Sequence, residues 1–477
     1  MRHLFLRTLS TLVFLFILVG HSENALAIPA FARKYETSCS TCHTAYPVLN
    51  AIGRAFKAAG YRIPTEDQQL IKDKPVSLGA PAWKQVFPRA VWPSDIPGGS
   101  VASFWLSSQF RANPSAPITN EFDGLNELYV LTAGTIGESF SFLAELEIIN
   151  NGTVPVDFGA ALPRAFIQYN HPSHKFNVTY GLFEPRAVLS STRLRLIRIG
   201  DYLANSYGMP PTGNSFSLGP NQRGVELWGN VEGFRQRGGL EWFAGLVNGR
   251  DSGTPSGASA FGTAVQELNA RLQAALAAEG RTGFENNSSK DFYVGANYKI
   301  GGMGVLGEGL SEPELQGPES YSETAVTLGV FYYRGYAPAL VSERGAENLD
   351  RNGNAFQRTG AKAVFDVGNG NILAGLQLNR DRVREERNFD EIITLVEARY
   401  ALFPWLIPAV RFENLNPNFG VAFNRTTLHG SILARANVRL SLEGVLSRNS
   451  PSDAIRDYRR YDAGNDSRFQ FRLDFAY

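Results

Sequence analysis

The chain has 477 residues, of which 46 are lysine or arginine and 45 are aspartate or glutamate, so its formal net charge is +1. A near-neutral chain offers no bulk attraction to a polyanion, and no nucleic-acid partner is predicted. Mean hydropathy is −0.17, and the one long apolar run lies at the amino end, which excludes a helical membrane protein. The 47 glycines, 32 phenylalanines and 18 tyrosines favour antiparallel β structure with many turns.

Residues 1–27 have the pattern of a secretory signal peptide. Arg2 and Arg7 precede an uncharged apolar run at 9–20, and a small-residue cleavage pattern ends at Ala27. The alternative is an anchoring helix, which needs about 20 apolar residues, more than this run supplies. The mature chain is therefore predicted to start at Ile28 and to be exported.

The two cysteines of the chain lie in one short motif, Cys39-Ser40-Thr41-Cys42-His43. This is the signature of covalent haem attachment, in which two thiols add to the vinyl groups of one haem and the adjacent imidazole becomes the proximal iron ligand. A disulfide is the alternative for two cysteines in an exported chain, but their spacing and the following histidine argue against it. A thioredoxin-like redox pair would use the same spacing, but it needs a surrounding βαβ pattern that is missing here. We predict one covalently bound haem c, with Cys39 and Cys42 as attachment sites and His43 as iron ligand.

The haem segment is predicted to span residues 28–64. A helix is expected to open at Pro47 and to close at Gly60 in a left-handed cap. Leu49, Ile52 and Phe56 would then share one face, which packs either on the porphyrin or on the following domain. A segment under about 40 residues usually needs a covalent link, a bound cofactor or a partner to stay folded, so we expect the following domain to enclose it. Residues 65–99, rich in proline, lysine and tryptophan, are the predicted connector.

Residues 100–477 are predicted to form a transmembrane β-barrel of the outer-membrane type. Apolar residues at 469, 471, 473, 475 and 477 alternate with Gln470, Arg472 and Asp474, as in a strand with one face toward lipid and the other toward water. The same parity recurs over 139–148 and 437–446. A strand of a soluble sandwich would also alternate. The connectors favour the barrel, because short ones and long ones alternate as in outer-membrane proteins.

Counting strands in this way gives about 16, which would leave an open lumen. The connector at 301–320 is a long segment assigned to the periplasmic side, and residues 264–278 are predicted to form a helix in an outer loop. The short periplasmic connectors are predicted at 137–139, 171–174, 368–370, 402–405 and 435–437. The long outer connectors are predicted at 112–123, 185–221, 249–290, 335–356 and 447–467.

The amino end resembles the fused monohaem cytochrome-porins, which are known as outer-membrane iron oxidases. The resemblance is carried by Pro29-Ala30-Phe31-Ala32-Arg33, by the haem motif, and by Pro47, Leu49-Asn50-Ala51, Gly53-Arg54-Ala55-Phe56-Lys57 and Gly60-Tyr61. It implies a haem enclosed by an outer-membrane barrel and Fe(II) as the electron donor. At 34–37 the chain has Lys-Tyr-Glu-Thr, where the iron oxidases usually carry a Gln-Thr-Gly-like stretch, so the donor stays open.

A haem joined to a barrel predicts electron transfer across the outer membrane of a Gram-negative bacterium, because an apolar band ~25 Å tall otherwise blocks electron movement. We expect an extracellular donor such as Fe(II), a periplasmic cytochrome or other carrier as acceptor, and outer-membrane lipid around the barrel. The activity would be that of an iron oxidase or electron-transfer protein. Two alternatives stay open: a solute-transporting porin with a haem-bearing plug or redox gate, and electron flow in the reverse direction.

The sixth iron ligand would come from a small pool of residues. Met209 lies in Gly208-Met209-Pro210-Pro211, which resembles the Met-Pro loops of soluble c-type cytochromes, and its connector is long enough to fold into the lumen. It is the candidate distal ligand, and a water-bound iron is the alternative. The other methionines and histidines of the mature chain, besides His43, are Met303, His171, His174 and His429. His429 shares parity with Thr427 and Ser431 and is expected to line the lumen.

No residue is predicted to capture a metal ion from solution. An acidic cluster, Glu308, Glu312 and Glu314, is assigned to the periplasmic side. The stretch at 350–354 has its glycine two places too early for a Ca²⁺ loop and lacks the closing glutamate. Both are interpreted as solvated loops.

Overall fold

The computed structural model describes residues 30–63, 67–72, 102–114, 119–136, 138–150, 162–249, 263–278, 289–307, 322–343, 346–384, 388–418, 422–450 and 468–476. The predicted signal peptide, most of the predicted connector and the acidic cluster at 308–314 lie outside these ranges.

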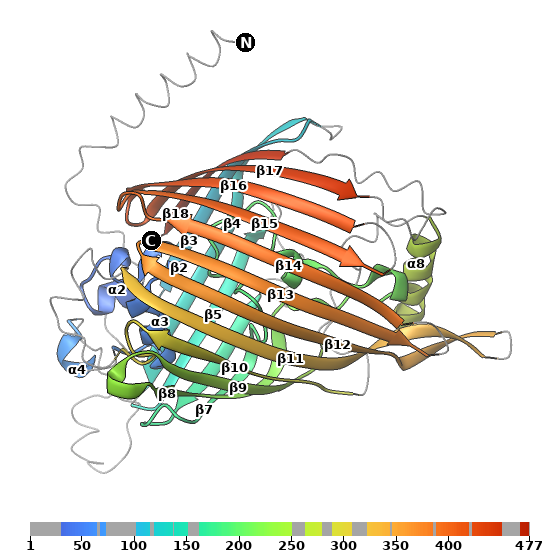
Figure 1. Cartoon of the computed structure of the whole chain (residues 1–477), viewed down its shortest axis with the longest axis horizontal. Helices are drawn as coiled ribbons and strands as arrows, with labels where there is room; N and C mark the ends of the chain where they lie inside the picture. Colours follow the sequence, from blue (N-terminus) through green and yellow to red (C-terminus); the bar gives the residue numbers. More distant parts are fainter. Residues whose placement is uncertain are drawn as a thin grey trace, which may run out of the picture.

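Strands β3 to β18 each pair antiparallel with the next, and β18 pairs with β3, which closes a barrel of 16 strands (Figure 1). The predicted architecture and strand count are confirmed. The barrel strands are β3 (Ala102–Ala112), β4 (Asn120–Ile136), β5 (Phe140–Asn150), β6 (Arg164–Asn170), β7 (Asn177–Phe183), β8 (Gln222–Glu232), β9 (Gly239–Val247), β10 (Asp291–Gly301), β11 (Glu323–Glu343), β12 (Ala346–Gly368), β13 (Gly370–Val383), β14 (Asn388–Tyr400), β15 (Leu406–Pro417), β16 (Ala422–Arg435), β17 (Val438–Ser450) and β18 (Arg468–Ala476).

The barrel wall is apolar outside and charged inside. In β15 the side chains of Val410 and Phe412 are exposed, whereas those of Arg411 and Glu413, which alternate with them, are completely buried. Other strands repeat this arrangement, with exposed leucine, isoleucine, valine and aromatic side chains on the outer face. A water-soluble protein would bury the apolar side chains and expose the ions. Only a closed barrel surrounded by lipid satisfies both faces, so the chain is a transmembrane barrel of the Gram-negative outer membrane.

The two ends of the barrel differ as expected. Short turns at 137–139, 171–176, 401–405 and 436–437 join strands at one end, and the connectors at 184–221 and 248–290 leave the other. We call these the periplasmic end and the outer end. The prediction of a loop at 335–356 was wrong, because β11 and β12 stay paired from Glu323 with Gly368 to Glu343 with Ala346. Burial of Ala337 and Ala339 against the contents of the lumen stabilises this extension despite its turn-forming residues.

The connector at 184–221, here called the inner segment, folds into the lumen as its length had suggested. It includes α7 (Leu203–Ser206) and η2 (Pro210–Thr212). The Tyr202 hydroxyl donates to Glu397 of β14 at 3.0 Å, and the Leu203 N–H donates to Glu413 of β15 at 2.6 Å. Apolar side chains of the inner segment form a core with inward-facing residues of the wall. The lumen therefore holds a packed polypeptide rather than an open channel along this wall.

Helix α8 (Thr263–Ala278) confirms the predicted outer-loop helix. It buries Leu272 and Leu276, and Leu272 lies against the backbone of the inner segment at Gly213. The short η3 (Phe234–Gln236) lies in the turn between β8 and β9. In the described part of the chain, we find no helix with both the length and the apolar composition of a membrane span.

The amino-terminal segment occupies the periplasmic end, opposite α8 (Figure 1). It is bonded to strands around the barrel: the Ala30 N–H donates to Ser103 of β3 at 2.7 Å, Arg62 donates to the Phe140 carbonyl of β5 at 2.8 Å, and Arg439 of β17 donates to the Tyr46 carbonyl at 2.7 Å. The expected enclosure by the barrel is therefore found. Its elements are α2 (Ala30–Lys34), η1 (Cys39–Thr41), β1 (His43–Ala45), β2 (Val48–Leu49), α3 (Ala51–Ala58) and α4 (Asp67–Leu70).

Candidate haem site

Asn50 joins the haem motif to the helix that follows it. Its Oδ1 accepts the Gly53 N–H at 2.9 Å and so caps α3, while its Nδ2 donates to the carbonyl oxygens of Ser40 and Thr41 at 3.1 and 2.9 Å. The prediction that Pro47 opens this helix was wrong. Pro47 lies in the turn between β1 and β2, and asparagine is the stronger N-cap because its side chain satisfies a free N–H of the first turn.

Glycines shape both ends of α3. A Cβ at Gly53 would overlap the Cys42 carbonyl oxygen, so only glycine lets the helix lie this close to the motif. The same carbonyl accepts the Asn50 N–H at 3.0 Å. At the far end Gly60 has φ +72°, and the Tyr61 N–H donates to the Phe56 carbonyl at 2.9 Å. The predicted left-handed cap is therefore present.

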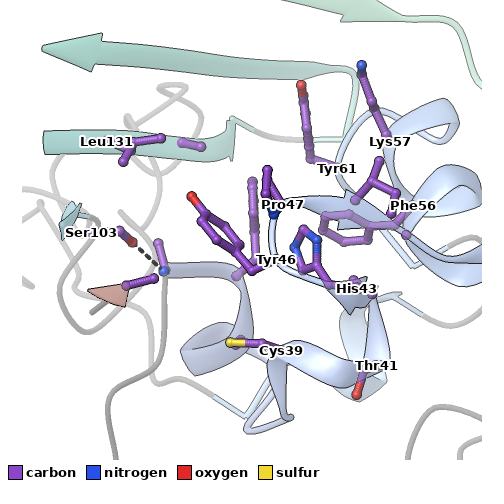
Figure 2. A pocket seen from close by; sticks show the side chains of 18 of the residues that line it. Cys39, Thr41, His43, Tyr46, Pro47, Phe56, Lys57, Tyr61, Ser103 and Leu131 are labelled. Carbon is purple, nitrogen blue, oxygen red and sulfur yellow. Dashed lines mark hydrogen bonds between the residues drawn. The ribbon is translucent and has the colours of Figure 1, made fainter. Parts of the chain in front are cut away.

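The motif residues line a cavity of about 410 Å³ inside the periplasmic end of the barrel. Figure 2 shows the His43 ring near Tyr46 and Phe56 on its wall. The helix face formed by Leu49, Ile52 and Phe56 also lines it. This volume lies in the ~300–1,000 Å³ range of cofactor sites, which are mostly apolar with a few polar groups.

The three motif side chains have the chemistry that haem attachment needs. Burial lowers the pKa of His43 to about 4, so its imidazole is neutral at pH 7 and has a lone pair for a metal. The buried Nδ1 of His43 has no hydrogen-bond partner. Burial also raises the pKa of Cys39 to about 11 and that of Cys42 to about 12, and the two side chains are free cysteines rather than a disulfide. These residues fit a covalently bound haem.

One side of the cavity is polar. Arg164 of β6 and Arg193 of the inner segment lie 3.1 and 3.4 Å from Glu145 of β5, and Lys57 of α3 lines the same wall. Burial lowers the pKa of Lys57, and the nearby Glu184 opposes this shift. The three cations could hold the propionate groups of a porphyrin, because buried carboxylates require such partners.

A line of aromatic contacts leads away from His43. The ring centroids of His43 and Tyr46 are 5.3 Å apart, and those of Tyr46 and Trp105 are 6.0 Å apart. Trp105 of β3 then stacks on Tyr129 of β4 with centroids 5.2 Å apart and an interplanar angle of 18°. This arrangement was not predicted from the sequence. Its signal was the inward parity of 105 and 129, two aromatic residues on a face otherwise expected to be polar.

The structure does not bring Met209 to His43. Met209 is fully buried in a cluster with Ala339, Val383 and Phe389, near the outer ends of β11, β13 and β14, and it does not line the cavity. The inner segment that carries Met209 does enter the lumen, but there Met209 packs on the barrel wall, nearer the outer end than the haem segment. The predicted distal-ligand role of Met209 is therefore corrected: in this fold its thioether belongs to an apolar core.

The other candidate ligands have structural roles. His429 faces the lumen, as predicted, with Nδ1 2.8 Å from Glu443 and Nε2 2.6 Å from Ser431. His171 and His174 lie in the turn between β6 and β7. Met303 packs against the cluster that contains Tyr35 and Phe56, but it does not line the cavity. Within the ranges given above, no group of three or more His, Cys, Asp or Glu side chains is arranged to hold a metal ion.

No protein-family model and no curated protein matches the sequence. Solved outer-membrane proteins are similar in fold. In vitro folded OmpT of Vibrio cholerae is 11% identical with a TM-score of 0.45, covering 79% of this chain and 98% of its own. OmpF of Salmonella typhi, in complex with daunomycin, is 10% identical with a TM-score of 0.47, covering 79% and 97%. An anion-selective porin from Comamonas acidovorans is 10% identical with a TM-score of 0.47, covering 79% and 98%.

These similarities are too distant to assign an activity. The strand pairing itself defines the chain as a porin-like outer-membrane barrel. Of the functions expected from the sequence, this fold supports a porin with a plug more directly than it supports electron transfer or iron oxidation.

Proposed function

We propose that this chain is an electron-transferring cytochrome-porin of the outer membrane, with one haem c held by Cys39, Cys42 and His43. The observation that carries the proposal is that these three residues open onto one cavity of about 410 Å³ enclosed by the barrel. When bound, the haem would supply a reversible one-electron carrier where lipid blocks electron movement.

The residues of this chain would hold and insulate that carrier. His43 presents a neutral imidazole, and Leu49, Ile52 and Phe56 give the cavity an apolar face. On the polar side, Lys57, Arg164 and Arg193 supply positive charge for carboxylates. The segment lies at the periplasmic end, within reach of a periplasmic cytochrome or other carrier.

The contents of the lumen favour electron transfer over solute passage. Leu196, Ile197 and Ile199 of the inner segment pack on Ala45 and Val48 of the haem segment. The inner segment is also bonded to the opposite wall through Glu397, Glu413 and Glu443. An electron needs no open path between such packed groups, whereas a hydrated solute does.

An extracellular donor such as Fe(II) would deliver one electron at the outer end, and the periplasmic carrier would receive it. The test uses the full-length protein in sealed liposomes that enclose oxidised cytochrome c. We expect an impermeant reductant added outside to reduce the enclosed cytochrome, and the Cys39→Ala variant to abolish this. An intact vesicle whose cytochrome stays oxidised with the wild-type protein would contradict the proposal. Electron flow in the reverse direction is tested by exchanging the two reagents.

A second candidate is a porin whose haem-bearing segment acts as a plug or redox gate. The observation that favours it is the barrel architecture itself, which is that of solute-conducting proteins. Conductance in planar bilayers separates the two functions. An electron conduit should pass little ion current whether oxidised or reduced, whereas a gated porin should open in one of the two states.

A further inference from the structure

A second cavity, of about 340 Å³, lies in the lumen toward the outer end of the barrel. Unlike the haem cavity, it is lined mainly by polar groups. We call it the arginine cavity because its wall contains Arg111 of β3, Arg198 of the inner segment, and Arg468 and Arg472 of β18. Its remaining lining residues include Asn113, next to the β3–β4 connector, so it lies on the outer side of the haem cavity.

Positive charge is in excess on this wall. The acidic side chains that line the arginine cavity are Glu121 and Glu127, two against four arginines. Glu127 is shared, lying 3.3 Å from Arg198 and 2.7 Å from Arg472. Two carboxylates beside the lining also pair with its arginines: Asp123 lies 2.8 Å from Arg111, and Asp474 lies 2.7 Å from Arg472 and 2.7 Å from Arg439 of β17, which shares it.

Part of the donor capacity of Arg198 and Arg111 is unused. The side chain of Arg198 is only 6% exposed, and its buried Nε has no hydrogen-bond partner, as is true of the Nε of Arg111. A buried guanidinium N–H without an acceptor is costly, and an anion in the cavity could supply that acceptor.

Trp105 separates the arginine cavity from the haem cavity. The guanidinium carbons of Arg198 and Arg472, which line the arginine cavity, lie 4.6 and 5.6 Å from the centre of the Trp105 ring. Trp105 itself lines the haem cavity and contacts Tyr46, the neighbour of His43. One indole therefore touches the groups of both cavities.

We infer that the arginine cavity binds a small anionic redox partner, such as an iron ion chelated by carboxylate ligands, and that Trp105 couples this partner to the haem site. The inference rests on the proposed electron transfer and narrows its donor class. A bare Fe²⁺ ion would be repelled by the excess of arginines, whereas a multiply charged anionic chelate would pair with them. The packed rings from Trp105 to His43 provide a short contact path between the two cavities.

The binding step is tested without any redox reaction. Hexacyanocobaltate(III) is a redox-inert trianion, and its binding to the detergent-solubilised full chain is measured by calorimetry. We expect one saturable site that weakens as salt is added, and about fivefold to tenfold weaker binding in Arg111→Gln, since one guanidinium contact is lost. Arg380→Gln is the matched control, because Arg380 is similarly exposed and pairs with Asp390 away from the cavity. Absence of binding, or equal losses in both variants, would overturn the inference.

The coupling step is tested with two oxidants of opposite charge. One electron leaves the reduced protein and converts ferricyanide into ferrocyanide, or hexaammineruthenium(III) into its ruthenium(II) form. We expect ferricyanide to react faster at low salt and Arg111→Gln to reduce this preference. Trp105→Leu should slow ferricyanide severalfold while the absorption spectrum and midpoint potential stay unchanged, with Trp105→Phe intermediate. Trp242→Leu on β9 controls for the loss of an indole elsewhere in the wall.

The outcomes distinguish this inference from the proposed function. If the protein contains no haem but binds hexacyanocobaltate in an Arg111-dependent way, the anion site stands and the electron-transfer proposal fails. A second outcome is that haem is present, that the two oxidants react at equal rates, and that Trp105→Leu reacts as fast as the wild type. The proposed function then stands, and the assignment of the arginine cavity fails.

Discussion

Glu443 of β17 accepts the backbone N–H of Ile199 at 2.6 Å, across 244 residues of sequence. The same carboxylate accepts the Arg198 N–H at 2.7 Å and lies 2.8 Å from His429. Glu443 thus fixes the inner segment to the wall of the barrel beside Leu196 and Ile197, which contact the haem segment. This anchor holds the inner segment across the lumen.

Removing this anchor should loosen the inner segment. Glu443→Ala leaves the buried N–H of Ile199, the partly buried N–H of Arg198 and the ring of His429 without this partner, at about 1–3 kcal/mol for each unsatisfied buried group. We expect a higher ion conductance in planar bilayers and faster proteolysis of the inner segment. Glu443→Gln, which retains an acceptor oxygen, should show a smaller change. A fully closed Glu443→Ala barrel would show that the anchor is dispensable.

The close approach of α3 to the haem motif should depend on Gly53. Gly53→Ala places a methyl group on the Cys42 carbonyl oxygen, so either the helix or the motif must shift. We expect a reduced yield of covalently bound haem, measured by haem staining of denaturing gels at equal protein load. Gly430→Ala, where an added Cβ meets no atom within 4 Å, is the control and should retain the full haem yield. Equal staining of the two variants would contradict the predicted role of Gly53.

Loss of the Asn50 cap should destabilise the same region by a smaller amount. Asn50→Ala removes the acceptor of the Gly53 N–H and the two donations to the motif carbonyls, and cap removal alone costs about 0.5–2 kcal/mol. Hydrogen exchange of the amides in 51–58 should speed up accordingly, while the barrel strands stay protected. Unchanged exchange in α3 would mean that the barrel, rather than the cap, stabilises this helix.

The inner segment should loosen in acid through Glu184. Burial alone would raise the pKa of this carboxyl, but Lys57 and hydrogen bonds from Ser191 and Thr192 hold it below its usual range. A carboxyl with a lowered folded-state pKa stabilises the fold above its ordinary pKa, near pH 4, and this contribution is lost as the pH falls below that value. Proteolysis of the inner segment should therefore accelerate below about pH 4. The Glu184→Gln variant should lack this part of the pH dependence.

The barrel could be predicted from sequence because its signal is local. Alternating apolar and polar residues, as in Phe469, Gln470, Phe471 and Arg472, identify the lipid face and the lumen face of each strand. Each short turn then fixes the register of the next strand. The loop predicted at 335–356 failed because its turn-forming residues are held in strands by contacts with the inner segment. Those contacts join residues more than a hundred positions apart, so they cannot be predicted from the pattern of neighbouring residues.

The candidate site was predictable to a different degree at each residue. The spacing of Cys39, Cys42 and His43 is itself a chemical requirement, so the motif indicates its ligand directly. Met209 was misplaced because a Met-Pro loop specifies a type of turn and not the place in the lumen where that turn packs. Trp105 was missed because its position between two cavities follows from the path of the inner segment, which brings Arg198 to its ring.

The covalent haem is the central claim and can be measured directly on the purified protein. We expect the mature chain, purified in detergent from a host that assembles c-type cytochromes, to give a pyridine haemochrome spectrum of haem c with one haem per chain. Cys39→Ala and Cys42→Ala should lose the two-thioether spectrum. A correctly folded, colourless wild-type barrel from the same host would contradict the account.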